Sequence, residues 1–181
     1  MVFLGGLEIA PLTNPIAMVL RRTEAFLLDI LIIFGICAPI GYLIQRLIGT
    51  SPQTGPAIWS TILWNISLPA WLYFLWSDHS KKGKSVGKWL LNLKVKTRTS
   101  ERLGWGRALA RTAIKLLPWE IIHFSSFALS KEFGTFTLHQ YIGLVAGNLL
   151  AFAYFIASIL TQGKRSIHDI LLGTEIQFEN F

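Results

Sequence analysis

Ionisable side chains stand inside or beside long apolar stretches of this sequence. Asp29 lies in the first such stretch, and a later one holds Arg111, Lys115, Glu120 and His123. A charged group at bilayer depth costs roughly 2.5 to 3.5 kcal/mol on insertion scales. Residues of this kind mark either buried polar contacts between helices or a path for ions and protons.

Asp29 needs a hydrogen-bond donor from another helix, because an unpaired buried carboxylate takes up a proton rather than staying charged. Arg22 precedes it by seven residues on the same helix face, about two turns away, which makes direct contact between them unlikely on spacing alone. Arg107, Arg111 and Lys115 form a ladder at four-residue spacing on a later helix. We expect Arg111 to pair with Asp29, either as a structural ion pair that fixes helix register or as a titrating transport site.

The segment from Ser166 to Asp169 has the spacing of a capping box, with Asp in place of Glu, and a glycine four residues later is placed to end the helix. Asp169 is therefore expected to cap a short cytoplasmic helix. The same carboxylate, together with His168, can face the mouth of a helix bundle beside Arg22 or Arg111 as a relay or cation site. The two roles are compatible.

Glu120 and His123 share a helix face at a spacing of three residues, which carboxylate-bridged metal bundles also use. Those bundles repeat the motif on a second helix, and this sequence contains one copy. We therefore expect no metal here. The pair is predicted to form a hydrogen bond within the bundle or, as the second possibility, a pH-sensitive contact.

The sequence contains no convincing motif of a soluble enzyme. Gly83, Lys84 and Ser85 resemble the end of a phosphate-binding loop, but Asp78 stands where that motif needs a glycine. A nucleophile elbow, a zinc-type cysteine pair and a dinucleotide fingerprint are also missing from the sequence. We expect neither enzymatic activity nor a bound cofactor.

Long apolar helices must position these groups. The stretches 56–76 and 140–160 each run for 21 residues without Asp, Glu, Lys or Arg, and a membrane span needs about 20. Between Glu24 and Arg46 the only formal charge is Asp29, whereas 110–130 is interrupted by charges and by Pro118. The sequence predicts an all-α integral membrane protein, a four-helix transmembrane bundle with spans at about 24–48, 56–76, 110–130 and 140–160. The third of these could instead begin as an interfacial helix.

The net charge of +7 is concentrated in one segment. Eleven of the 17 Lys and Arg residues lie between Lys81 and Lys115, in and just after the polar loop 77–107, with Glu101 as the only acid among them. This is the positive-inside pattern of a cytoplasmic loop rather than a nucleic-acid surface. We expect a multi-pass plasma membrane protein whose termini, including the tail 161–181, are cytoplasmic, with the lipid bilayer as a partner and no nucleic acid.

Local patterns predict further elements. Asn14 and Pro15 are a helix start, and Ser85 can cap a short helix. The segments 91–97 and 174–178 alternate apolar and polar residues, which predicts a small cytoplasmic strand pair.

A stripe of small residues marks the last span. Gly143, Gly147 and Ala151 recur at four-residue spacing, a pattern that lets helix backbones approach closely. The stripe either packs within the chain, which we favour, or forms the face of a homo-oligomer.

Taken in order, several motifs resemble the RDD family of small integral membrane proteins. The family is named for one arginine and two aspartates, which here would be Arg22, Asp29 and Asp169. The resemblance covers residues 22 to about 178 and implies a single membrane domain over 1–181; Glu24 departs from the small or apolar residue expected there. The motifs that carry it are Arg22-x-x-Ala25-x-x-x-Asp29, Gly83-Lys-Ser-Val-Gly87-Lys88 with Leu93 and Val95, Arg107 to Arg111, and Arg165-Ser-Ile-His-Asp169-x-x-x-Gly173-Thr174.

The resemblance implies two kinds of function. Some members are proposed to be sodium–proton antiporters, and here Asp29 and Asp169 would alternately bind a proton and a monovalent cation. Others look like accessory or scaffold subunits, in which the charged triad would lock the bundle. The basic loop, with Lys81, Lys82 and Lys84, would then dock a protein partner or anionic lipid headgroups. The number of ionisable groups at membrane depth favours transport.

Overall fold

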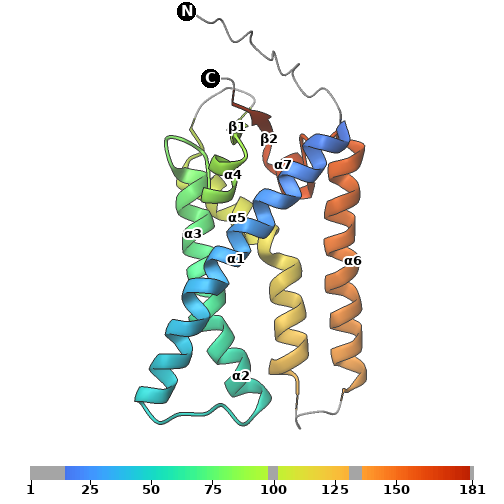
Figure 1. Ribbon diagram of the computed structural model, residues 1–181. Helices are drawn as coiled ribbons and strands as arrows, with labels where there is room; N and C mark the ends of the chain where they lie inside the picture. Colours follow the sequence, from blue (N-terminus) through green and yellow to red (C-terminus); the bar gives the residue numbers. More distant parts are fainter. Residues whose placement is uncertain (1–14, 98–101, 131–135, 180–181) are drawn as a thin grey trace, which may run out of the picture.

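The computed structural model describes residues 15–97, 102–130 and 136–179, so Asn14, the predicted cap of the first helix, lies outside the described residues. Figure 1 shows the long helices side by side, with the short helices 86–90 and 167–172 and both strands gathered at the end where the first helix begins. The elements are α1 (Pro15–Leu47), α2 (Gly55–Ile62), the π-helix η1 (Leu63–Ser67), α3 (Leu68–His79), α4 (Val86–Leu90), β1 (Leu93–Thr97), α5 (Trp105–His123), the π-helix η2 (Phe124–Ala128), α6 (Leu138–Leu160), α7 (Ile167–Leu172) and β2 (Thr174–Phe178).

Three helical stretches are long and apolar enough to cross a membrane. They are Pro15–Leu47 with 33 residues, Gly55–His79 with 25 residues, and Leu138–Leu160 with 23 residues. These stretches correspond to the first, second and fourth predicted spans. At 1.5 Å per residue α1 is roughly 50 Å long, so it exceeds a hydrocarbon core of about 30 Å.

The predicted span 110–130 is helical, but it differs from the other three in composition. Helix α5 begins at Trp105 and continues as η2 to Ala128, and Figure 1 shows this run beside α6. Because it carries several charged residues, this helix is not among the three stretches that are apolar enough to span. Arg111, Thr112 and Leu116 are buried, so a polar stripe of α5 faces the interior of the protein.

Capping residues begin α4, and begin and end α7, where the sequence predicts. Ser85 is the N-cap of α4, and its side chain accepts a backbone N–H from the first turn. Ser166 and Asp169 form a complete capping box at the start of α7. Gly173 ends α7 with φ 64°, in the left-handed region that favours glycine.

The two strands form an antiparallel pair. Leu93 lies opposite Phe178, and Thr97 lies opposite Thr174. This confirms the predicted pairing of the polar segment with the C-terminal part of the chain. Two five-residue strands are not stable alone in water, so the pair depends on what it packs against.

Two buried apolar clusters hold the elements together. One joins the sheet to the first half of α1, and the other lies among α1, α3 and α5. Their members are Met18, Ala25, Leu93 and Ile176 in the first cluster, and Ile33, Ala70, Phe74 and Leu116 in the second.

The small residues of α6 pack against the same chain. A Cβ atom added to Gly143 would lie 1.8 Å from Ser125 Oγ, and one added to Gly147 would lie 2.5 Å from Ile122 Cγ1. Both contacts are shorter than real Cβ contacts, so these glycines let α6 approach α5 and η2. Of the two uses predicted for this stripe, the structure contains the packing within the chain.

Candidate functional site

Buried charges gather at one end of the molecule, where α4, α7 and the sheet meet α1, α3 and α5 (Figure 1). Three aspartates there are almost fully buried, with exposed fractions of 1% for Asp29, 2% for Asp78 and 0% for Asp169. We call the ion-paired part of this group the charge network; it consists of Arg22, Asp78, Lys88, Arg111 and Asp169.

Arg111, 1% exposed, joins two carboxylates from different elements. Its Nη2 donates to Oδ1 of Asp169 at 2.7 Å and its Nε donates to the same oxygen at 3.1 Å, while Nη1 binds Asp78. The second oxygen of Asp78 accepts from Nζ of Lys88 at 3.0 Å. One guanidinium and one ammonium thus link α5 to α3, α4 and α7.

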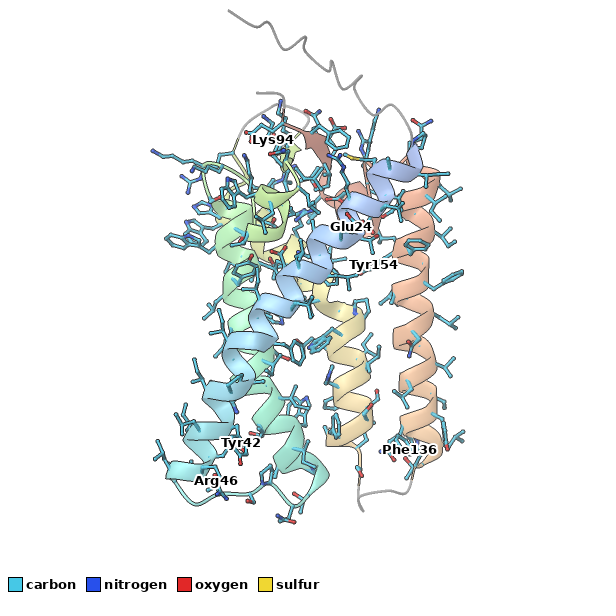
Figure 2. All side chains as sticks on the ribbon, viewed as in Figure 1. Glu24, Tyr42, Arg46, Lys94, Phe136 and Tyr154 are labelled. Atoms are coloured by element: carbon cyan, nitrogen blue, oxygen red, sulfur yellow. The ribbon has the colours of Figure 1, made fainter. Side chains whose placement is uncertain are left out.

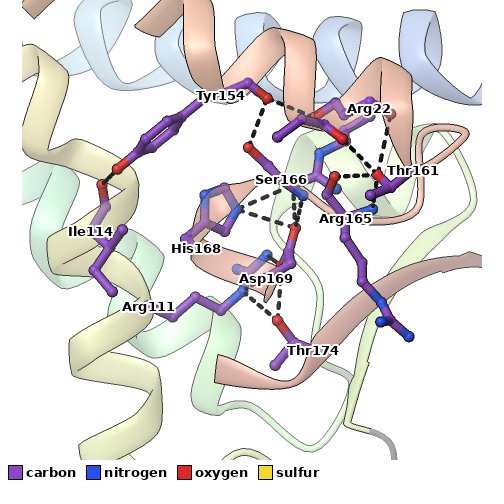
Figure 3. Close-up of polar contacts among 12 residues, drawn as sticks. Arg22, Arg111, Ile114, Tyr154, Thr161, Arg165, Ser166, His168, Asp169 and Thr174 are labelled. Carbon is purple, nitrogen blue, oxygen red and sulfur yellow. Dashed lines mark hydrogen bonds and ion pairs between the residues drawn. The ribbon is translucent and has the colours of Figure 1, made fainter. Parts of the chain in front are cut away.

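Asp169 is held from several sides (Figure 3). Arg22 of α1 forms an ion pair with Oδ2, and the backbone N–H of Ser166 donates to the same oxygen at 3.1 Å. Thr174 Oγ1 donates to Oδ1 at 2.8 Å. The structure therefore places Asp169 against both of the arginines considered from the sequence, Arg22 and Arg111, and keeps its capping role.

This surrounding holds Asp169 in the charged form. Burial by itself would raise the pKa of the carboxyl group, but the guanidinium groups of Arg111 and Arg22 lower it well below its ordinary value. A carboxylate bound by two guanidinium groups offers few free lone pairs to a further cation.

His168 is neutral in the same surrounding. Its Nε2 lies 3.1 Å from Nη2 of Arg22 and 3.4 Å from Oδ2 of Asp169. Because a guanidinium can only donate, we assign Nε2 as the acceptor in the shorter contact and the ring proton to Nδ1. Burial lowers the pKa of His168 well below its ordinary value; the attraction of Asp169 opposes this shift, and repulsion by Arg111 and Arg22 adds to it. In the described residues the buried Nδ1 has no hydrogen-bond partner.

The prediction that Asp29 pairs with Arg111 is wrong. Asp29 accepts hydrogen bonds from Tyr73 OH at 2.6 Å, Ser85 Oγ at 2.5 Å and the backbone N–H of Gly87 at 2.7 Å. Arg111 already binds two other carboxylates, and the segment that carries Ser85 and Gly87 covers Asp29 instead. As expected from the spacing, Arg22 does not bind Asp29 either; it binds Asp169.

Asp29 anchors the polar loop to α1. Ser85 is both a ligand of Asp29 and the cap of α4. A Cβ atom on Gly87 would lie 2.1 Å from the carbonyl oxygen of Ala25, so glycine is needed for α4 to reach the helix backbone. Tyr73 extends the contact, because its hydroxyl oxygen accepts the N–H of Val86 at 2.8 Å.

The predicted hydrogen bond between Glu120 and His123 is also wrong. Glu120 accepts from Trp71 Nε1 at 3.0 Å and from Ser67 Oγ at 3.3 Å. The His123 ring turns back along its own helix, with Nδ1 2.8 Å from the carbonyl oxygen of Trp119 and its ring against the indole. Glu120 therefore joins α5 to α3 and η1, and among the described residues no cluster of His, Cys, Asp and Glu could hold a metal.

Two central members of the charge network were missed from the sequence. In the sequence Asp78 stands out only as a mismatch to a phosphate-binding loop, and Lys88 only as the last residue of the motif at 83–88, with no ion pair predicted for either. A usable signal exists for Asp78, since it is the first charge after the apolar stretch 56–76 and precedes the lysine-rich segment. A lone acid in that position is a candidate partner for a buried base.

Comparison with known protein families matches residues 16–173 to the RDD family. The match covers most of the chain and includes α1 through α7, with every member of the charge network. No curated protein and no solved structure matches the chain.

Replacing Asp169 by Asn tests the charge network as a structural element. The variant leaves Arg111 and Arg22 without their shared carboxylate, so we expect a loss of about 3–5 kcal/mol in the free energy of unfolding in detergent. Glu24→Gln is the control, because Glu24 is exposed on α1 (Figure 2) and should change stability by no more than about 0.5 kcal/mol. Equal unfolding temperatures for Asp169→Asn and the native protein would contradict a stabilising network.

His168 predicts a pH dependence of stability. Its pKa is lowered in the folded state, so between that value and the ordinary value of about 6.5 the unfolded chain binds more protons. Stability is therefore lost as the pH falls below about 6.5, by up to about 1.4 kcal/mol per pH unit. His168→Gln keeps an acceptor for Arg22 and should flatten this slope in unfolding measured from pH 7.5 to 5.5.

His139→Gln is the matched control for the pH series, because His139 is exposed. It should retain the native slope. If the slope survives in His168→Gln, the titrating group lies elsewhere and a neutral, buried His168 is refuted.

Proposed function

The chain belongs to the RDD family of membrane-type proteins, and we propose that it is a non-catalytic membrane module of the scaffold or accessory type. In this role the charge network holds the layer made of α4, α7 and the two strands against the long helices. The observation that carries the proposal is that Asp78 and Asp169 each bind cations from two different elements. Charged groups that are paired with one another across elements are typical of a structural role.

The arrangement in the membrane follows from charge and aromatic residues. We place α5 and η2 as a fourth crossing helix, because their buried stripe faces the protein. The lysine-rich end is cytoplasmic by the positive-inside rule, which puts both termini in the cytoplasm. We assign the chain to the plasma membrane. Exposed Trp76, Trp89 and Trp105 mark the interface at that end, and Tyr42 marks the opposite one (Figure 2).

The fixed layer presents a basic surface to the cytoplasm. Lys81 and Lys82 are exposed and have no carboxylate partner in the part of the chain that the structure describes. Lys84 differs, because it pairs with Glu179. Next to the two free lysines, the exposed ring of Trp76 offers apolar area. An acidic segment of a protein partner with an apolar side chain matches this combination.

Neutralising Lys81 and Lys82 together tests this docking surface. Lys81→Gln with Lys82→Gln should lower the amount of at least one co-purifying membrane or cytoplasmic protein about tenfold, measured by quantitative mass spectrometry after mild detergent extraction. Lys96→Gln with Lys164→Gln removes the same charge elsewhere at this end and should leave that protein bound. An unchanged set of co-purifying proteins would place the docking surface elsewhere, and loss of bound anionic lipid alone would identify a headgroup surface instead.

A second candidate, cation–proton antiport, is favoured by one observation. Asp29 is a buried carboxylate contacted only by neutral donors, namely Tyr73, Ser85 and the N–H of Gly87, among the described residues. Such a group can exchange a proton for a cation more readily than Asp169, whose oxygens are held by two arginines. In this role four helices form a thin wall, so the antiporter would need an oligomer.

Proton flux in proteoliposomes separates the two candidates. With sodium, lithium or potassium added in turn, the scaffold role predicts no cation-dependent flux from folded native protein. Flux that is present in the native protein and lost in a folded Asp29→Asn variant would reverse this assignment and establish Asp29 on a transport path. Glu24→Gln serves as the control, since it removes an exposed carboxylate from the same helix.

A further inference from the structure

A cavity of about 350 Å³ lies between α1, α5, α6 and α7. This volume is in the range of small-molecule sites in proteins. One end of the cavity is polar and includes members of the charge network, and the other end is apolar. The polar end is lined by Arg22, Lys88, Arg111, Lys115 and His168, and the apolar part by Phe26, Ile30, Trp119, Ile122, Ala151 and Phe155.

The polar end has one basic side chain more than it has carboxylates. Arg22, Lys88, Arg111 and Lys115 lie near three carboxylates, Asp29, Asp78 and Asp169. Each of the first three cations binds a carboxylate.

Lys115 is the basic side chain without a carboxylate partner. In the described part of the chain its ammonium group has no carboxylate partner, and it rests on two rings, 3.2 Å from the centroid of Phe74 and 5.4 Å from that of Phe26. A ring face attracts a cation without neutralising it. Burial disfavours the charged form of an amine that has no anion beside it, so an anion bound here would hold Lys115 in its charged form.

His168 supplies a second unused group to the same cavity. Its Nδ1, which carries the ring proton, is buried without a hydrogen-bond partner in the described residues. A buried donor left without an acceptor is costly. Figure 3 shows the ring between Tyr154 and Asp169, and both Tyr154 and His168 line the cavity. The described residues thus leave a ring donor and a basic side chain without an acceptor.

The cavity reaches the outer surface of the helices. Phe26 of α1 and Phe155 of α6 line it and are themselves 37% and 43% exposed. Both helices are long and apolar enough to span, so this surface faces lipid when they do. Tyr154 lies on the side of α6 toward α1 and α5 (Figure 2). A molecule can therefore extend from the polar end, past the apolar wall, into the bilayer.

We propose that this cavity binds one phospholipid of net negative charge from the surrounding bilayer, with its phosphate at Lys115 and His168 and one acyl chain along the apolar wall. A zwitterionic headgroup fits less well, because Asp78 and Asp169 already bind cations and Asp29 accepts three hydrogen bonds, from Tyr73, Ser85 and the N–H of Gly87. The site is separate from the docking surface at Lys81 and Lys82 and holds whether the module is a scaffold or an antiporter.

Native mass spectrometry of the detergent-purified protein tests the site directly. Dioleoyl phosphatidylglycerol is compared with dioleoyl phosphatidylcholine, which has the same chains and a zwitterionic headgroup. We expect one tightly held phosphatidylglycerol per chain, bound about tenfold more tightly than phosphatidylcholine, as one charge-assisted contact provides. Equal affinity for the two lipids overturns the proposal.

Two variants act on opposite ends of the cavity. Lys115→Gln removes the unpaired charge, and Ala151→Phe fills the apolar part; each should abolish the preference for phosphatidylglycerol. Lys164→Gln and Leu149→Phe make the same changes at exposed positions outside the cavity and should retain it. Lys115→Arg keeps the charge and should retain binding.

The same assay identifies the source of the anion. Phosphatidylglycerol binding that survives in both folded cavity variants overturns the site. Displacement of the lipid by inorganic phosphate, or preferential binding of oleate, identifies a free-anion or fatty-acid site and overturns the phospholipid assignment. Because Ala151→Phe leaves every charge in place, a failure of Lys115→Gln to fold does not remove the test.

Discussion

The burial of the Arg111 guanidinium is the constraint on which the rest of the structure depends. A charge that is 1% exposed cannot stay in the protein interior without partners. Its two carboxylates come from α3 and α7, which are far apart along the chain, so satisfying one residue brings two elements to α5. Arg22 and Lys88 then neutralise the remaining oxygens and draw in α1 and α4.

The layer made of α4, α7 and the two strands is held by polar contacts more than by its own core. Its strands and helices are five or six residues long, and the cluster that joins the sheet to α1 contains four buried apolar residues. Elements of this size do not persist alone. Asp29 fixes the start of α4, and Asp169 caps α7 while binding two arginines. The acids inside the helices thus determine where the layer sits.

Polar groups with and without partners lie side by side at this end of the molecule. The members of the charge network are fully paired, which suits a structural role. Lys115 and Nδ1 of His168 are unpaired among the described residues and border a cavity with an apolar wall. This division separates the ionisable groups that hold the fold from those that are available to a ligand. A count of ionisable groups at membrane depth includes both kinds, and such a count favoured transport over a scaffold.

The sequence by itself determined the features that depend on neighbouring residues. Apolar length predicted three helices able to span, residue types at helix ends predicted the caps of α4 and α7, and alternation predicted the strand pair. Only the tertiary structure decided the pairing of charges: Asp29 is covered by the polar loop instead of binding Arg111, Asp78 joins the network, and Glu120 turns to α3 instead of His123. Spacing along a helix specifies which side chains share a face. The rotation of that face, and the segment that covers it, are set by packing between elements distant in sequence.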